Sequence, residues 1–268
     1  MPEKFLILGS SSFYGSNFAK LVREKGDEAI CLSKPGWYLG DELPDGEYVV
    51  NFASQSLVAE SWENPGLWIT TNVQSTTALF RGVLFRRFKK FIHVSTPESY
   101  GHTDGWVTEN YKSWVPSTPY GVSRAAADLM LMAYHRAYQF PALITRTANI
   151  YGEGQPDHRI IPKAFKFKKE GKKLPLHGNG DSVRCFIHVR DACEATYLLA
   201  KEGKVGETYH ISTRQSHWIR DVVEMIGCEW KAAPERLGKD GAYLLHSGKV
   251  RDLGWEDTIK LEDWIASR

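Results

Sequence analysis

The N-terminal stretch constrains the fold more than any other part of the chain. Lys4 to Leu8 predicts a β-strand, a turn from Gly9 to Gly15 follows at once, and a helix then runs through Glu24. In such a unit, free backbone N–H groups and the helix dipole point at the turn, which makes it a seat for a pyrophosphate. Any tight turn favours glycine, but the position directly after an N-terminal strand favours the dinucleotide interpretation.

Further apolar runs along the chain predict the rest of a sheet. They alternate with segments of helical character, the longest being Gly66 to Leu84 and Ser123 to Tyr138. Because parallel strands need helical crossovers, this alternation predicts an α/β fold, a Rossmann-like doubly wound parallel sheet with a smaller α+β substrate lobe. The expected strands are Glu28 to Leu32, Tyr48 to Ala53, Phe91 to Val94, Ala142 to Arg146 and Thr208 to Ser212.

The connection between the second and third of these strands is unusually short. Pro35 to Asp45 is rich in Gly, Pro and Asp, and it is too short for a helix and a further strand. The sheet is therefore expected to be shortened around its usual third strand. Where the second strand ends, an NAD site usually offers an acid, whereas here Ser33 and Lys34 follow. These residues suit the 2′-phosphate of NADP, and Lys34 is equally interpretable as a solvated loop residue.

The amino-acid composition of the chain changes after the predicted strand that begins at Ala142. Gly154 to Gly180 is rich in Pro, Gly and Lys, whereas 186–212 regains strand and helix patterns. We therefore expect a nucleotide-binding domain of residues 1–151 plus 186–212, and a discontinuous lobe of residues 152–185 plus 213–268. Several basic side chains could together bind a diphosphate there, although each is also typical of a solvated surface. They are Arg159, Lys163, Arg184, Arg236 and Lys239.

A second constellation lies in the middle of the chain. The apolar run Phe91 to Val94 predicts a buried strand, which places Thr96 and Glu98 at its carboxyl end, where open α/β sheets hold ligands. Downstream, Tyr120 and Arg124 lie one helical turn apart on the same face. A hydroxyl, a carboxylate, a phenol and a guanidinium in one cleft suit the removal and return of protons around a carbonyl. A tyrosine at a helix start also serves packing, so the pattern alone leaves both interpretations open.

Composition narrows the class of protein. The chain has 268 residues, of which 42% are hydrophobic and 25% charged, with a net charge of +2, values typical of a globular protein. That charge argues against nucleic-acid and membrane partners, and the four scattered cysteines argue against a disulfide frame or a zinc site. The N-terminal apolar run is too short for a signal peptide or a membrane span. We expect a cytoplasmic protein without a bound metal.

Stretches spread over nearly the whole chain match the motifs of one family in the same order. They are Leu8 to Gly15, Asn51 to Ser56, Ser61 to Pro65, Thr71 to Gln74, Val94 to Gly101, Ser117 to Gly121, Arg146 to Gly152, Leu174 to Val189 and Pro234 to Trp255. Through them the chain resembles the extended short-chain dehydrogenase/reductases, the NAD-dependent epimerase/dehydratase family, and in particular the nucleotide-sugar 4,6-dehydratases of the dTDP-glucose type. The resemblance implies a doubly wound sheet over NAD, with NADP as the alternative, and a smaller lobe over a nucleotide-diphosphate sugar. It also implies a homodimer formed through the two long helices, 66–84 and 120–138.

The same resemblance implies a role for each residue of the central constellation. Tyr120 is the base that takes the proton of the sugar hydroxyl as a hydride leaves C4, and Thr96 hydrogen-bonds the same oxygen. The ketone at C4 acidifies the C5 proton, Glu98 removes it, and water is lost across C5–C6. The residues implied around the cofactor are Gly9, Ser11, Ser12, Phe13, Tyr14, Gly15, Ser33, Lys34, Phe52, Ala53, Ser54, Asn72, Ser95, Tyr120 and Arg124. Those implied around the substrate are Thr96, Glu98, Tyr120, Asn149, Arg159, Pro175, His177, Arg184, Arg236 and Lys239.

The chain departs from the family pattern at several positions. Arg124 replaces the lysine of the Tyr-x-x-x-Lys motif, and it keeps the positive charge near Tyr120 although its planar fork differs from an ammonium. Pro97 replaces the Asp of Thr-Asp-Glu, so the acid that protonates the leaving hydroxyl is missing. Relatives with Thr-Ser-Glu, the GDP-mannose dehydratases and UDP-glucuronate decarboxylases, lack it too, and Glu98 then shuttles the proton both ways. Ser12 replaces the middle glycine of the cofactor turn, which bears on cofactor affinity.

The resemblance therefore implies an NAD(P)-dependent nucleotide-sugar 4,6-dehydratase, a lyase. The same oxidation at C4 also serves 4-epimerases and decarboxylases of the family. The retained Thr-x-Glu pair favours dehydration, because a simple 4-epimerase has less need of a base at C5. The alternative from another class is a protein that binds a cofactor or nucleotide with little turnover, and Arg124 and Pro97 keep that interpretation open.

Overall fold

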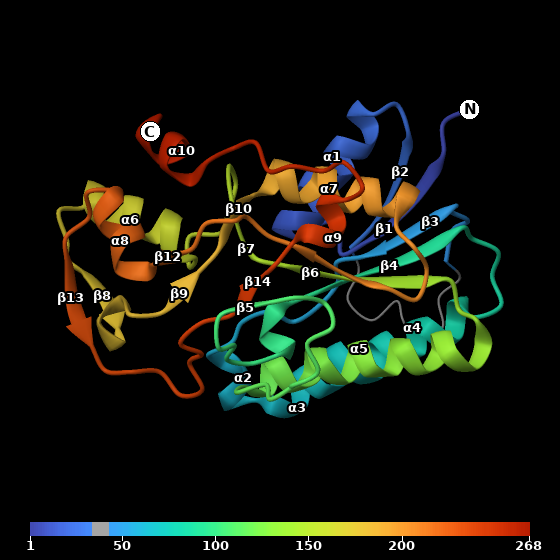
Figure 1. The fold of residues 1–268 in the computed structure, drawn as a ribbon, viewed down its shortest axis with the longest axis horizontal. Helices are drawn as coiled ribbons and strands as arrows, with labels where there is room; N and C mark the ends of the chain where they lie inside the picture. The colour runs from blue at the N-terminus through green and yellow to red at the C-terminus, as the bar shows by residue number, and fades with distance from the viewer. Residues whose placement is uncertain (34–42) are drawn as a thin grey trace.

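The computed structural model describes residues 1–33 and 43–268, and its centre is a parallel sheet (Figure 1). The strand order is β11-β6-β4-β3-β1-β2, and every neighbouring pair is parallel. The runs of Val, Ile, Leu and Phe predict such strands because a parallel sheet is buried on both faces. The strands are β1 (Lys4–Leu8), β2 (Glu28–Leu32), β3 (Tyr48–Asn51), β4 (Lys90–Ser95), β6 (Ala142–Thr147) and β11 (Thr208–Ile211).

Helices cover both faces of this sheet, which confirms the predicted doubly wound fold. Figure 1 shows α1 (Phe13–Glu24) and α7 (Val189–Glu202) on one face, and α4 (Thr76–Val83) and α5 (Pro119–Tyr138) on the other. Strand β1 serves both layers, because alternate side chains point to opposite faces. Its Phe5 and Ile7 pack in the cluster that contains α1 and α7, while its Leu6 and Leu8 pack against α4 and α5.

The two long helices differ in detail from the sequence prediction. Helix α5 begins at Pro119 rather than at Ser123, because Thr118 caps it by accepting a hydrogen bond from the Gly121 N–H at 3.0 Å, and proline suits the first helical position. The other long helix is a run of three segments, in which π-helical turns separate two α-helical parts. Preceded by α2 (Glu60–Glu63), these segments are α3 (Pro65–Trp68), η2 (Ile69–Ser75) and α4.

Strand β2 lies at one edge of the described sheet. Within the described residues β2 is the edge strand, and β3 pairs with β1 on its other side. The connection that was expected to replace a third strand includes residues 34–42, which lie outside the described residues. The described strands on either side of this connection, β2 and β3, are among those predicted from the sequence.

A second group of elements packs around its own core at the other end of the molecule (Figure 1). It holds more strands than the short helices and loops expected for residues 213–268, because β12 and β13 each pair with a strand from 174–184. The elements are α6 (Ile160–Lys169), β8 (Leu174–His177), η4 (Gly178–Gly180), β9 (Val183–Arg184), β12 (His217–Trp218), α8 (Ile219–Met225), β13 (Trp230–Ala233) and α10 (Leu261–Ala266).

Short strand pairs join this group to the sheet. Strand β7 (Asn149–Tyr151), which follows β6, pairs with β10 (Phe186–His188), which leads into α7. Strand β14 (Leu244–Leu245) pairs with β5 (Trp106–Val107) and precedes α9 (Gly248–Arg251). These crossings bring residues 240–245 back to the carboxyl ends of the central strands, where the predicted site residues lie.

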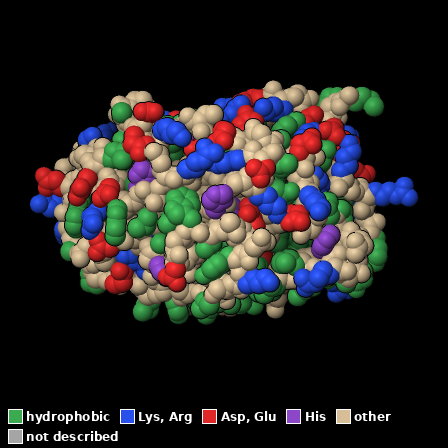
Figure 2. Space-filling model, in the orientation of Figure 1, with side chains coloured by type: hydrophobic (Ala, Val, Ile, Leu, Met, Phe, Trp, Pro, Cys, Tyr) green, Lys and Arg blue, Asp and Glu red, His purple; other side chains and the backbone are tan. Residues whose placement is uncertain are grey.

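Three further findings bear on function. Among the helices of residues 1–33 and 43–268, none is both long and apolar enough to cross a membrane. The same residues contain no cluster of His, Cys, Asp and Glu side chains that could hold a metal ion. Figure 2 shows acidic and basic side chains interspersed over one face of the molecule, with no large area of a single charge.

Candidate active site

The turn after β1 is closely packed against the loop after β3. Gly9 has a φ of +75°, and a Cβ atom there would meet the Ala53 backbone nitrogen at 2.7 Å, so only glycine fits. A Cβ atom on Gly15 would in turn meet the Gly9 carbonyl. Ser12 takes the middle position as the N-cap of α1, since its Oγ accepts from the Gly15 N–H at 3.1 Å and donates to the Gly9 carbonyl at 2.7 Å. Serine thus completes the turn that the family builds with glycine.

Other residues predicted near the cofactor shape its surroundings. Asn72 accepts from the Gln55 N–H at 2.8 Å and donates to the Gln55 carbonyl at 3.0 Å, which fixes the loop after β3 that contains Phe52, Ala53 and Ser54. The hydroxyl of Tyr14 instead bonds within the protein, to the Ala192 carbonyl at 2.9 Å and to Thr196 Oγ1 at 2.7 Å. Ser11 and Ser33 are exposed, Phe13 is partly buried, and Lys34 lies outside the described residues.

The catalytic candidates meet where β4 ends. Thr96 caps the short helix η3 (Pro97–Ser99), and its Oγ1 accepts from the Glu98 N–H at 3.3 Å. The first turn of α5 packs directly on η3, since a Cβ on Gly121 would meet the Glu98 carbonyl at 2.7 Å. This close approach places the buried Tyr120 beside Thr96 and Glu98. Burial and the charge of Glu98 raise the pKa of Tyr120, while the charge of Arg124 and a hydrogen bond with Thr96 act in the opposite direction.

Glu98 has one satisfied and one free carboxyl oxygen. Its Oε1 accepts from the Tyr243 hydroxyl at 3.2 Å, whereas its buried Oε2 has no hydrogen-bond partner within the described chain. Burial raises the pKa of Glu98, and the charge of Arg184 and the bond from Tyr243 lower it in part. A carboxyl group held this way is suited to exchange a proton with a ligand. Sequence reasoning missed Tyr243, because only the fold joins residues 145 positions apart.

Arg124 is almost fully buried beneath this cluster. Its Nη2 donates to the Val94 carbonyl and lies 3.5 Å from His93 Nε2, while Nε and Nη1 have no partner in the part of the chain that the structure describes. Two unpaired donors on a buried cation call for oxygen acceptors. Ribose hydroxyls supply such acceptors, and the Gly9–Gly15 turn lies at the N-terminus of α1, where the helix dipole favours an anion such as a pyrophosphate. The residues present therefore fit a dinucleotide.

A buried polar network lies behind the cluster and was not predicted. Asp128 accepts from Ser95 Oγ at 2.8 Å and from Arg146 Nη2 at 2.8 Å. His93, whose Nε2 is 3.6 Å from Asp128, has its pKa lowered to about 3 by burial and by the Arg124 charge, so the ring is neutral. The Arg146 guanidinium lies 4.0 Å and 4.2 Å from the ring centroids of Tyr100 and Trp114. This network fixes β4, α5 and β6 to one another, and it engages the hydroxyl of Ser95, a residue that the resemblance places around the cofactor.

The residues predicted to bind the substrate fall into separate places. Asn149 reaches the cluster, because its Oδ1 lies 3.2 Å from the Tyr243 hydroxyl. Arg184 lies behind Tyr243, with its guanidinium 3.9 Å from the ring centroid, and its Nη1 and Nη2 donate to the carbonyls of residues 183, 240 and 241. The exposed Arg159 is near enough to lower the pKa of both Tyr120 and Glu98.

A second set lies on strand β8 and in the segment that follows β13. His177 bonds to the Pro234 carbonyl at 2.6 Å, and Lys239 donates to the His177 carbonyl at 2.9 Å. Pro175 lies on the same strand β8, and Arg236 is exposed nearby. The structure therefore brings Thr96, Glu98, Tyr120 and Asn149 together and leaves this set at the rim of the second group of elements.

Comparisons with known proteins decide the family. The family model described as GDP-mannose 4,6 dehydratase matches residues 44–250. The low-salt glycan biosynthesis protein Agl12 of Haloferax volcanii is 30% identical over 97% of this chain and 95% of its own length. The chain belongs to the GDP-mannose 4,6-dehydratase family.

Other relatives of this family carry more specific names. A dTDP-glucose 4,6-dehydratase of Xanthomonas campestris is 33% identical over 85% of this chain and 72% of its own length. The crystal structure of DesIV, a dTDP-glucose 4,6-dehydratase of Streptomyces venezuelae with NAD and TYD bound, has a TM-score of 0.89. It is 29% identical and covers 98% of this chain and 94% of its own. The chain is thus an enzyme of the nucleotide-sugar dehydratase and epimerase class, with an NAD(P) cofactor.

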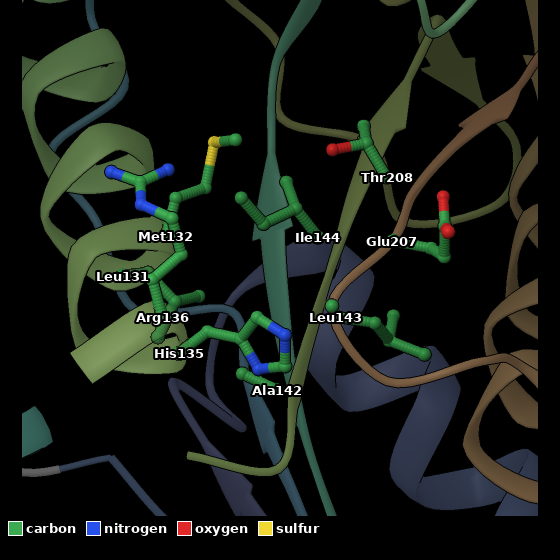
Figure 3. A pocket seen from close by; sticks show the side chains of 10 residues that line it. Leu131, Met132, His135, Arg136, Ala142, Leu143, Ile144, Glu207 and Thr208 are labelled. Atoms are coloured by element: carbon green, nitrogen blue, oxygen red, sulfur yellow. The ribbon is translucent and has the colours of Figure 1, made fainter. Parts of the chain in front are cut away.

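A separate cavity of about 230 Å³ lies at the other edge of the sheet. Figure 3 shows its lining from the end of α5, the start of β6 and the turn before β11, including Met132, Arg136, Leu143 and Thr208. Open α/β sheets bind their ligands at the carboxyl ends of the parallel strands. The cavity is at the amino end of β6, so it is not part of the candidate active site.

Proposed function

We propose that this protein is an NAD(P)-dependent nucleotide-sugar 4,6-dehydratase. The observation that carries the proposal is the partly buried Glu98 beside Tyr120 and Thr96, whose Oε2 atom is buried and has no hydrogen-bond partner among the described residues. A 4-epimerase needs a base at the C4 hydroxyl, and Tyr120 suffices for that step. A second proton acceptor held in the same cleft is what dehydration requires, because the C5 proton must also be removed.

The chain's own residues would divide the work as follows. The cofactor supplies an acceptor for the hydrogen at C4 and later returns it to the sugar. Tyr120 takes the C4 hydroxyl proton, helped by the Arg124 charge, which favours the phenolate. Thr96 holds the same oxygen. The C4 ketone makes the C5 proton acidic, and Glu98 removes it as the C6–O bond breaks. Burial of Glu98 raises its pKa, which suits a group that must also give a proton back.

The proposal also assigns binding residues to the cofactor and to the sugar nucleotide. We infer that the Gly9–Gly15 turn holds the cofactor pyrophosphate and that Asn149 and Arg159 face the sugar nucleotide, with Pro175, His177, Arg236 and Lys239 at its nucleotide end. The lobes would be residues 1–151 plus 186–212 for the cofactor, and 152–185 plus 213–268 for the sugar nucleotide. A cytoplasmic location also remains a prediction.

A homodimer is supported by an apolar helix surface. Four large apolar side chains on the two long helices, in α3, η2 and α5, are 39–53% exposed. Exposed apolar side chains on neighbouring helices are typical of a helix–helix interface. The residues are Leu67, Ile69, Val122 and Leu129. Light scattering should report a dimer, and Leu129→Glu should convert it to a monomer; a wild-type monomer contradicts the assignment.

The proposed activity is tested by mass spectrometry of the purified protein with NAD or NADP and a panel of sugar nucleotides. The panel contains dTDP-glucose, GDP-mannose, UDP-N-acetylglucosamine, UDP-glucuronate and CDP sugars. A product lighter by one water supports the dehydratase and names its substrate. Loss of carbon dioxide identifies a decarboxylase, and an isomer of unchanged mass identifies an epimerase. If every sugar is returned unchanged while the cofactor binds, the dehydratase proposal is wrong.

A further inference from the structure

The hydroxyl of Tyr243 faces two acceptors at the same distance. Glu98 Oε1 and Asn149 Oδ1 each lie 3.2 Å from it. A phenol has one proton to donate, so it cannot bond to both acceptors at once. The Asn149 side chain can accept at this oxygen whatever the pH. The Glu98 carboxyl, in contrast, accepts as a carboxylate and can donate as a carboxylic acid.

Two arrangements of protons follow from this geometry. When Glu98 is ionised, the Tyr243 proton points to Glu98 Oε1, because a charged acceptor makes the stronger hydrogen bond. When Glu98 is protonated on Oε1, it donates to the Tyr243 oxygen, and the Tyr243 proton turns to Asn149. Each arrangement satisfies the tyrosine hydroxyl. Rotation of one O–H bond therefore accompanies each change in the protonation of Glu98.

We propose that Tyr243 is a positioning residue that supports both protonation states of Glu98 by turning its proton between Glu98 and Asn149. The inference rests on the proposed dehydratase function, because a carboxyl that acts as a base and then as an acid needs such support. Pro97, next to Glu98, offers no acid of its own. Glu98 is thus the carboxyl that must serve both steps.

The proton transfers balance with Glu98 as the single carrier. Glu98 takes the C5 proton while the electrons of that bond form the C5–C6 double bond and the C6–O bond breaks. It passes the proton to the departing hydroxide, which leaves as water. As a hydride from a bound cofactor would return to C6, Glu98 would take a proton from solvent and deliver it to C5. The carboxyl therefore gains and loses a proton twice in each turnover, and Tyr243 turns with each change.

The surroundings hold Tyr243 in place for this role. The Arg184 guanidinium stacks on its ring at 3.9 Å, and the bonds from Arg184 to backbone carbonyls fix that cation in turn. The charged groups that act on Glu98 are Arg184, Asp240 and Arg159, and Tyr120 titrates beside it. None of these is altered by substitutions at 243 or 149, so both variants report on the hydroxyl itself.

Infrared difference spectroscopy of the purified protein tests the inference without substrate. The carboxylic-acid band of Glu98, identified by its loss in Glu98→Gln, is titrated against pH in three proteins. Tyr243→Phe removes the donor to the carboxylate, so the titration should move to higher pH. Asn149→Ala removes the acceptor that serves the protonated state, so it should move to lower pH. Two shifts in the same direction, or no shift, overturn the inference.

Steady-state kinetics give a second test, and this test distinguishes the role of Tyr243 from the proposed dehydratase function. The acid limb of kcat/KM should move in the same two directions, and Tyr243→Phe should lower kcat about tenfold while KM changes little. The control is Tyr151→Phe. Tyr151 is another buried tyrosine, and its hydroxyl donates to the Ile259 carbonyl at 3.0 Å rather than to Glu98. This substitution should leave the acid limb of kcat/KM unmoved. Opposite infrared shifts without any dehydrated product overturn the function alone. Dehydration without opposite shifts overturns the role of Tyr243 alone.

Discussion

The turn after β1 and the surroundings of Glu98 differ in how far along the chain their parts lie. In the turn, Gly9, Ser12 and Gly15 contact one another through backbone and N-cap bonds. Around Glu98, the Tyr243 hydroxyl comes from 145 positions away, and the second acceptor of that hydroxyl comes from another strand. The first region is a local structure, whereas the second exists only when segments distant in the sequence have folded together.

The two regions differ in the substitutions that they can tolerate. The turn tolerates little change, because backbone atoms approach positions that a side chain would occupy. Serine is accepted there only because its hydroxyl caps α1. The acidity of Glu98, in contrast, depends on burial, on Arg184 and on Tyr243, each from a different part of the fold. Substitutions around Glu98 can therefore alter its acidity without disturbing the turn after β1.

The largest effect on activity is expected in the surroundings of Glu98. Glu98→Gln keeps the shape of the side chain and removes the base, so dehydration should slow about a thousandfold. Oxidation at C4 does not need this carboxyl and should persist, seen as near-ultraviolet absorbance of the reduced cofactor when substrate is added. Glu109→Gln is the matched control, since burial also raises the pKa of Glu109 but it accepts from the His210 N–H instead. Dehydration at the wild-type rate in Glu98→Gln contradicts the assignment.

The local region is tested by a pair of glycine substitutions. Gly9→Ala places a Cβ at 2.7 Å from Ala53 with φ at +75°, so cofactor affinity should fall between about ten- and a hundredfold. Gly26 has a φ of +84° and no atom within 4 Å of its Cβ position, so Gly26→Ala shares the backbone strain without the clash. It should lower the melting temperature and leave affinity unchanged. Fluorescence titration with NAD and NADP measures both; equal losses of affinity would show that strain alone matters.

Arg124 links the two regions and should give an intermediate effect. Lysine is shorter and lacks the fork, so Arg124→Lys should lose the bond to the Val94 carbonyl and weaken cofactor binding and turnover about tenfold. Steady-state kinetics and cofactor titration report this change. A large gain in turnover is the opposite outcome, and it would mean that arginine impairs the native site. In that case the low-turnover binding protein becomes the better description.

The sequence predicted the sheet and the cofactor turn because their signals are local. Apolar runs, helical periodicity and glycine spacing identify β1, α1 and β4 without knowledge of the fold. The start of α5 was misplaced because the Thr118 cap was not used as a helix signal. Thr96, Glu98 and Tyr120 were found through motifs that lie close together in the chain.

The remaining features could not be predicted because the fold alone creates them. Tyr243 stands in a short apolar run with no polar pattern, and Asp128 lies between the ordinary helix formers of residues 125–127 and 129–133. Their roles come from contacts with Glu98 and with Arg146. Arg184 was expected to offer its charge to a diphosphate, and the structure shows much of its hydrogen-bonding capacity used on backbone carbonyls. A residue type alone does not reveal which of its donors are free.

The smallest expected effect concerns stability, and its sign separates buried from surface carboxyls. Burial raises the pKa of Glu98 above its ordinary 4.5, so the native state holds more protons than the unfolded chain in the window above that value. Stability therefore falls as pH rises through this window, and Glu98→Gln should be more stable than the wild type at neutral pH, by about 1 kcal/mol or less. The advantage should vanish in acid, where both states of the wild type are protonated.

Glu207 supplies the opposite sign as a control. A hydrogen bond from Lys249 lowers the pKa of Glu207, so its contribution is present at neutral pH and is lost as pH falls through the lowered pKa. Glu207→Gln should therefore be less stable than the wild type at neutral pH and converge with it in acid. Melting temperatures of the three proteins across pH test both curves. If Glu98→Gln also proves less stable at neutral pH, then the cleft stabilises the charged carboxylate, and the long-range surroundings of Glu98 favour a permanent anion over a proton carrier.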